Sequence, residues 1–148
     1  LDAYLDKVVE LGDIHLIIEI KEHATPQAES ELARAVVTKV KERKLQNSID
    51  YQSSRQHICN ELKRYAASST TVYFMGNNLT PEYVKGLGFS GISYTVETFK
   101  RIPRWINEAH KLGLKVAVRG VTSADNGAWA KKSGADAIIT TTPTTIKK

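Results

Sequence analysis

Short apolar runs alternate with amphipathic segments along the whole chain. Runs rich in β-branched and aromatic residues predict strands, and apolar residues spaced three and four positions apart predict helices between them. The expected strands cover residues 15–21, 48–53, 71–75, 91–96, 115–121 and 137–140. The expected helices cover residues 1–11, begin at Thr25-Pro26, span 58–66, begin again at Thr80-Pro81, and cover 103–112 and 124–133. This alternation predicts an α/β fold, with a parallel sheet of about six strands and crossover helices.

The length of the chain bounds its organisation. It has 148 residues, of which 41% are hydrophobic, and no stretch has the composition of a linker. We therefore expect a single domain over residues 1–148. Length alone favours an open sheet, because a complete (β/α)₈ barrel needs about 200 to 250 residues.

Composition excludes several classes of protein. The net charge of +5 favours anionic ligands. It is not enough to indicate nucleic acid, because that footprint needs basic residues clustered on one face with aromatic residues beside them, and we expect no nucleic-acid partner. Cys59 is the only cysteine, which excludes an internal disulfide and a zinc site built on several cysteines. The apolar runs are shorter than the roughly 18 to 20 residues that cross a bilayer, so we expect no membrane span.

Residues 86–91 match the dinucleotide-binding pattern G-x-G-x-x-G letter for letter. That pattern must follow a strand and open a helix, so that backbone N–H groups meet a pyrophosphate. Here the glycines end a predicted helix and lead into a predicted strand. We interpret Gly86 and Gly88 as a helix end and a turn, and not as a nucleotide site.

Two charged side chains close the strand predicted at residues 15–21. Because strand side chains alternate, Glu19 and Lys21 are expected on one face and Ile18 and Ile20 on the other. Ligands of parallel α/β sheets bind at the carboxyl ends of strands, where a carboxylate and an ammonium can hold a hard cation and an anionic oxygen. The alternative is an ion pair at the strand end that faces solvent.

Four segments together resemble one known family. They are Ile17-Ile18-Glu19-Ile20-Lys21, Gly91-Ile92-Ser93-Tyr94, residues 109–118 (AHKLGLKVAV), and residues 134–140 (GADAIIT) followed by Pro143. In this order and spacing they resemble the glycerophosphodiester phosphodiesterases, and the resemblance runs nearly from end to end. It implies a (β/α) barrel of the TIM type, of which this chain is similar to the later part, with about six of the strands. That implication replaces the open sheet favoured by length.

The resemblance also implies an activity and roles for two residues. Members of the family hydrolyse glycerophosphodiesters to an alcohol and glycerol phosphate, with a calcium or magnesium ion and catalytic histidines. By resemblance Glu19 is a metal ligand, and Lys21 is a catalytic lysine that contacts the phosphate. The family's His-Arg-Gly motif, its second catalytic histidine and its other acidic metal ligands have no counterpart in these 148 residues.

Two positions depart from the family's pattern, and a third is a further candidate. Arg119 stands where the family usually has an aromatic residue; it either clamps a phosphate or is a charge tolerated at an exposed strand end. Residues 140–143 (TTTP) lack the aspartate that anchors this loop in the family. Tyr94 either lines the mouth of the site and binds substrate or fills the barrel as a buried aromatic.

These features predict a phosphoric diester hydrolase with a small phosphodiester substrate. The alternative is a catalytically inactive relative that binds phosphate or polyanions, or serves as a scaffold. Because exposed strand edges favour association, we expect the chain alone to form a homo-oligomer, to pair with an N-terminal half, or to close into a smaller barrel. The first residues of the sequence do not indicate a location, and the resemblance implies a periplasmic or secreted one.

Overall fold

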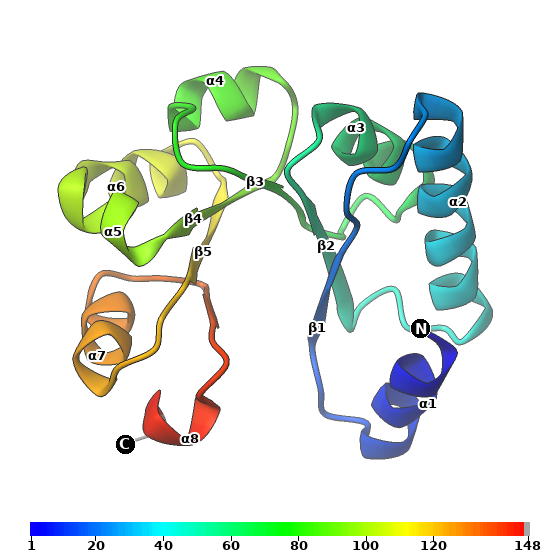
Figure 1. The fold of residues 1–148 in the computed structure, drawn as a ribbon, viewed down its shortest axis with the longest axis horizontal. Coiled ribbons are helices and arrows are strands. Elements are labelled where there is room, and N and C mark those ends of the chain that lie inside the picture. The colour runs from blue at the N-terminus through cyan, green and yellow to red at the C-terminus, as the bar shows by residue number, and fades with distance from the viewer. Residues whose placement is uncertain (147–148) are drawn as a thin grey trace. The chain divides into compact units, whose positions relative to one another are not determined.

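The computed structural model describes residues 1–146, and strands and helices alternate along them (Figure 1). The chain divides into two compact units, Leu1–Val72 and the chain from Tyr73 onward. Each unit is described by itself. In the described residues, no helix combines the length and the apolar character that a membrane crossing requires.

The first unit contains two parallel strands and three helices. Its elements are α1 (Asp2–Leu11), β1 (Leu16–Glu19), α2 (Pro26–Glu42), β2 (Ile49–Ser53) and α3 (Gln56–Tyr65). β1 pairs with β2 from Leu16 opposite Ile49 to Glu19 opposite Gln52. Thr25 caps α2 by accepting a hydrogen bond from the Ala28 N–H, and Pro26 opens the helix. The predicted Thr25-Pro26 helix start is therefore confirmed.

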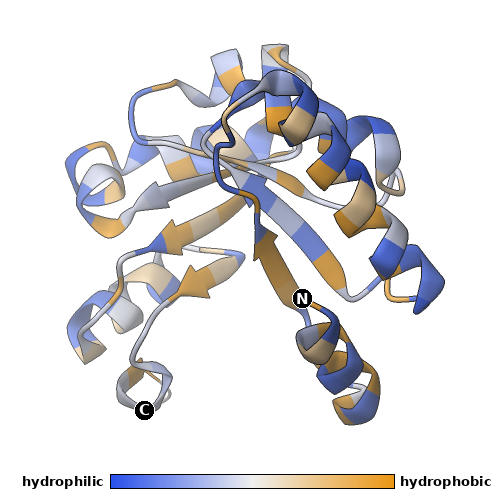
Figure 2. Ribbon diagram, turned by 45° about the vertical axis from the view of Figure 1, so that its right-hand side comes forward, coloured by the Kyte–Doolittle hydropathy of each residue, from blue (hydrophilic) through white to orange (hydrophobic). Residues whose placement is uncertain are grey.

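The core of the first unit lies between its strands and its helices. α2 buries Ala33, Val36, Val37 and Val40, and α3 buries Ile58, Cys59 and Leu62. In Figure 2 the helices carry hydrophobic and hydrophilic residues side by side, as amphipathic helices do. Burial raises the pKa of the Cys59 thiol to about 12, and the thiol donates a hydrogen bond to the Ser53 carbonyl.

Ion pairs add to the packing of α1 on α2. Lys39 Nζ lies 2.8 Å from both carboxylate oxygens of Asp2. Arg43 reaches Asp2 through Nη2 at 2.9 Å and Asp6 through Nε at 2.8 Å. The hydrogen bond from Lys39 holds the pKa of Asp2 below its ordinary value. Since these side chains are solvent-accessible, α1 depends mainly on its buried Leu5 and Val8.

The second unit continues the alternation with parallel strands. Its elements are β3 (Val72–Met75), α4 (Pro81–Gly86), β4 (Gly91–Thr95), α5 (Val96–Arg101), α6 (Arg104–Lys111), β5 (Lys115–Arg119), α7 (Ala124–Lys132), β6 (Ala137–Ile139) and α8 (Pro143–Ile146). β4 pairs with β3 on one side and β5 on the other, and β5 pairs with β6. The aromatic core includes Phe89, Tyr94, Phe99 and Trp105.

The six predicted strands and the α/β class are confirmed, but several boundaries differ. The strand predicted to run to Lys21 ends at Glu19. β5 ends at Arg119 because Gly120 takes a left-handed φ of 74°. The sequence analysis missed α5, which begins directly after β4 because the Thr95 hydroxyl caps it by accepting from the Thr98 N–H. Gly86 ends α4 and Gly88 has a φ of 78°, so the interpretation of these glycines is confirmed.

Asp136 precedes β6 and ties three groups together. Its Oδ2 accepts from the Val116 N–H at 2.8 Å and lies 2.9 Å from His110 Nε2, and its Oδ1 accepts from Lys115 Nζ at 3.3 Å. Burial acts to raise its pKa, but the hydrogen bonds from Val116, His110 and Lys115 outweigh it, so the pKa lies below its ordinary value. The folded chain therefore favours the ionised carboxylate.

Replacement of Asp136 should reduce stability in a way that depends on pH. As the pH falls, Asp136 is protonated in the unfolded chain before it is protonated in the folded chain. The contribution of this carboxylate to the free energy of unfolding is therefore complete above about pH 4 and is lost below it. We expect Asp136→Asn to lower the free energy of unfolding at pH 7 by about 0.5 to 1.5 kcal/mol, and by less at pH 3. Urea unfolding at the two pH values measures this, with the exposed Asp13→Asn as control. Equal losses at both pH values would contradict the prediction.

Candidate functional site at the strand ends

Glu19 is the last residue of β1, and its side chain is exposed. In the register of the two strands it lies opposite Gln52, which is 5% exposed. Gln52 Nε2 donates a hydrogen bond of 3.3 Å to Glu19 Oε2. The carboxylate therefore stands at a strand end, oriented by a buried amide on the neighbouring strand, and its other oxygen makes no hydrogen bond or ion pair with the described residues.

Lys21 follows the end of β1 and is exposed. The Ile20 N–H still donates to the Gln52 carbonyl at 3.0 Å, and Ser53 Oγ donates to the Ile20 carbonyl at 2.7 Å. Within residues 1–146 the Lys21 ammonium makes no hydrogen bond or ion pair. Because Lys21 lies beyond the strand, the expectation that it shares a face with Glu19 through strand alternation does not apply as stated. Its role stays a prediction.

Glu19 is a suitable donor for a divalent cation, because calcium and magnesium prefer oxygen ligands. A cation of this kind needs several such ligands. In the part of the chain that the structure describes, no three His, Cys, Asp or Glu side chains come together in an arrangement that could hold a metal ion. The described residues thus do not make up a complete metal site.

Arg119 ends β5 in the second unit, and its guanidinium contacts backbone carbonyls. Nε donates to the Ser93 carbonyl at 3.2 Å, and Nη2 donates to the Gly76 carbonyl at 3.0 Å. Ser93 lies on β4, and Gly76 follows β3 directly. Arg119, at the end of β5, thus contacts the middle of β4 and the residue after β3, and neither of the two sequence-based interpretations included these contacts. Its contact with substrate stays a prediction.

Tyr94 on β4 is completely buried. Its ring centroid lies 5.7 Å from that of Phe99 and 5.9 Å from that of Trp105, on α5 and α6. Its hydroxyl donates to the Leu79 carbonyl at 2.7 Å, and burial raises the pKa of this hydroxyl. These contacts give Tyr94 a packing role, and its contact with substrate stays a prediction.

The threonine loop after β6 is held by its own hydroxyls. The Thr142 N–H donates to Thr140 Oγ1 at 2.9 Å, and Thr142 Oγ1 donates to the Thr122 carbonyl at 3.5 Å. A threonine hydroxyl thus links this loop to the segment after β5, although the sequence has no aspartate here.

The sequence analysis missed several residues near Lys21. They are Glu29, Gln52, Ser53 and Arg55, all in the first unit. For Gln52 and Ser53 a signal was available, because the carboxyl ends of adjacent parallel strands meet at one edge of the sheet. For Glu29 the sequence gives no signal of burial, because a glutamate in the first turn of a helix is ordinarily exposed.

Comparison with solved structures identifies the relatives of this chain. A glycerophosphodiester phosphodiesterase from Parabacteroides distasonis matches 97% of the chain with a TM-score of 0.89 and 31% sequence identity. The resemblance to the glycerophosphodiester phosphodiesterases is confirmed. No family model and no curated protein matches the sequence.

Two further phosphodiesterase structures share the fold at lower identity. A glycerophosphodiester phosphodiesterase from Agrobacterium tumefaciens matches 94% of the chain with a TM-score of 0.70 and 21% identity. A phosphodiesterase from Oleispira antarctica, in complex with its product sn-glycerol-3-phosphate, matches 99% with a TM-score of 0.77 and 14% identity. The chain spans 60%, 56% and 59% of the Parabacteroides, Agrobacterium and Oleispira structures. The (β/α)-barrel type of fold is confirmed, and the open sheet favoured by length is not.

Replacement of Arg119 should lower the stability of this chain. Arg119→Ala removes both hydrogen bonds to the Ser93 and Gly76 carbonyls. We expect a loss of about 1 to 3 kcal/mol in the free energy of unfolding, measured by urea denaturation. Arg104→Ala is the matched control, because this exposed arginine of α6 pairs, among the residues that the structure describes, only with Glu108. If the two variants lose equal stability, the hydrogen bonds from Arg119 to the backbone carbonyls do not stabilise the fold.

Proposed function

We propose that this chain carries part of a phosphodiesterase site that acts on glycerophosphodiesters and releases an alcohol and glycerol phosphate. The observation that carries the proposal is the Glu19-Ile20-Lys21 segment at the carboxyl end of β1, in a chain that matches a glycerophosphodiester phosphodiesterase over 97% of its length. The Oleispira structure with bound sn-glycerol-3-phosphate supports the choice of ligand.

In this proposal Lys21 contacts the phosphate. An ammonium group stabilises the negative charge on phosphoryl oxygens and the further negative charge that develops during attack on the diester. Lys21 suits the role because it is exposed at a strand end and its ammonium has no partner within the described residues. No protein carboxylate there competes with a phosphate for this charge.

We further propose Glu19 as one oxygen ligand of a calcium or magnesium ion. Such an ion would polarise a phosphoryl oxygen of the substrate. Gln52 supports this role because it holds one oxygen of Glu19, while the other has no partner among the described residues. A complete site would need further oxygen ligands, since calcium takes about six to eight.

The second candidate function is phosphate binding without turnover. The net charge of +5 favours it, as does the Lys21 ammonium, which has no partner among the described residues. Binding an anion needs neither a metal nor a proton donor. The two candidates share a ligand and differ in chemistry. Binding and turnover experiments on the same chain therefore separate them.

The first experiment measures binding of sn-glycerol-3-phosphate to the 148-residue chain by calorimetric titration. We expect binding to weaken about tenfold in Lys21→Ala, the effect of losing one hydrogen bond to a charged group. Lys111→Ala, at an exposed lysine on α6, is the control for net charge. No binding to the unaltered chain, or equal affinity in the two variants, would refute the role of Lys21.

The second experiment measures hydrolysis of a glycerophosphodiester in the presence of calcium or magnesium. We expect negligible turnover by this chain, because it has no His-Arg-Gly motif and positioned proton transfer contributes roughly 10² to 10⁴-fold. Glu19→Gln is the matched variant. Metal-dependent turnover that disappears in Glu19→Gln would show that the chain is active as it stands and would overturn this expectation.

A further inference from the structure

The carboxylate of Glu29 is buried in the first turn of α2. Glu29 is 1% exposed, and its Oε2 has no hydrogen-bond partner among the described residues. A buried carboxylate oxygen without a donor is unfavourable, so its presence calls for an explanation. The N-terminal end of a helix tolerates a negative charge, but tolerance alone does not explain why the charge is buried there.

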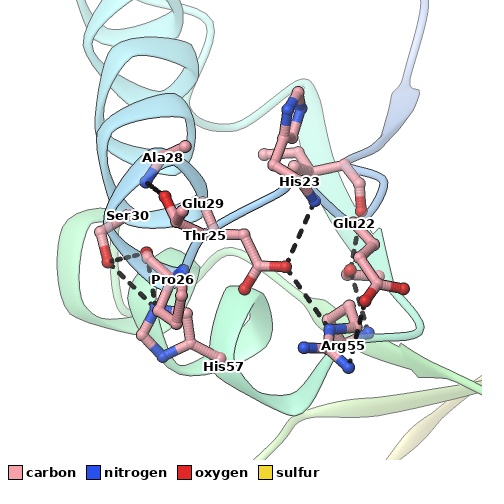
Figure 3. A network of polar contacts seen from close by, with 11 residues as sticks. Glu22, His23, Thr25, Pro26, Ala28, Glu29, Ser30, Arg55 and His57 are labelled. Atoms are coloured by element: carbon pink, nitrogen blue, oxygen red, sulfur yellow. Dashed lines mark hydrogen bonds and ion pairs between the residues drawn. The ribbon is translucent and has the colours of Figure 1, made fainter.

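The other oxygen of Glu29 contacts the segment that follows β1. Glu29 Oε1 accepts a hydrogen bond of 3.3 Å from the His23 N–H and lies 3.4 Å from Arg55 Nε. Figure 3 shows the carboxylate between the His23 backbone and the Arg55 guanidinium. One buried oxygen thus joins the loop after β1 to the residue that precedes α3.

The same loop is fixed again before Lys21. Ser53 Oγ donates to the Ile20 carbonyl at 2.7 Å and accepts from the Arg55 N–H at 3.2 Å. Ile20 is therefore held by the end of β2, and His23 is held by Glu29. Lys21 lies between these two fixed backbone positions.

Arg55 adds a third contact, to the residue after Lys21. Its Nη1 lies 3.5 Å from Glu22 Oε1. The residues on both sides of Lys21 are thus tied to one network, while the Lys21 ammonium makes no contact in the described part of the chain. This arrangement restricts the backbone at Lys21 and leaves its charge available.

We infer that Glu29 is a positioning residue, which holds the loop between β1 and α2 so that Lys21 is placed to bind a phosphate monoester or diester. The inference rests on the proposed function, in which Lys21 contacts the phosphate. A loop that is fixed before the ligand arrives loses less conformational entropy on binding. The buried charge of Glu29 therefore serves ligand binding and lowers the stability of the free chain.

The test replaces the carboxylate with an apolar side chain of similar length. Glu29→Met removes the acceptor for the His23 N–H and also removes the unpartnered oxygen. We expect an unfolding temperature at or above that of the unaltered chain, faster hydrogen exchange at the His23 amide, and affinity for sn-glycerol-3-phosphate about tenfold weaker. A residue with a merely structural role would lower the unfolding temperature and would not act on affinity.

Two further variants complete the experiment. Glu31→Met changes an exposed glutamate of the same helix, one that accepts only from Gln27, and should leave His23 exchange and affinity unchanged. Glu29→Gln keeps a side-chain oxygen that can accept from the His23 N–H, so it should restore most of the His23 protection and of the affinity.

The outcomes distinguish the inference from the function on which it rests. If Lys21→Ala weakens binding but Glu29→Met does not, the inference is wrong and the proposed function stands. Unchanged His23 exchange in Glu29→Met also overturns the inference. If Lys21→Ala leaves affinity unchanged, the proposed role of Lys21 fails, and the role of Glu29 fails with it.

Discussion

Parallel pairing of β1 with β2 is the interaction on which the candidate site of the first unit depends. The register places Glu19 opposite Gln52, so that the buried amide of Gln52 reaches the carboxylate. It also brings Ser53 to the Ile20 carbonyl. A slip of one residue would exchange the two faces of β1 and would separate all of these groups. Burial of Ile20, directly after β1, opposes that slip, because a shifted β1 would expose this side chain.

Charged side chains hold main-chain atoms near strand ends in both units. Glu29 accepts from the His23 N–H in the first unit, and Arg119 donates to the Ser93 and Gly76 carbonyls in the second. Charged groups form stronger hydrogen bonds than neutral ones, so single residues are able to fix loops that regular sheet pairing no longer holds. Some charged residues of this chain therefore fix the backbone near strand ends.

The sequence analysis predicted what depends on local patterns. Hydrophobic periodicity located six strands, the Thr25-Pro26 pair located the start of α2, and alternation at the strand end singled out Glu19. It did not find α5, because the Thr95 cap turns an apparently continuing strand into a helix within one residue. It did not find the partners of Glu29 or Arg119, because these are set by packing and most of them lie far away in the sequence. The sequence shows that Glu29 and Arg119 are charged, and only the folded structure shows which groups they contact.

The buried thiol of Cys59 gives this chain an internal reporter. Cys59 is the only cysteine, it is completely buried on α3, and its thiol donates to the carbonyl of Ser53 at the end of β2. Because Cys59 is buried, a thiol reagent can reach it only after α3 has opened away from the strands. Opening also exposes the thiol to water, where it can form the reactive thiolate. The rate at which Cys59 is labelled therefore measures how often α3 opens away from the end of β2, and the chain needs no added probe.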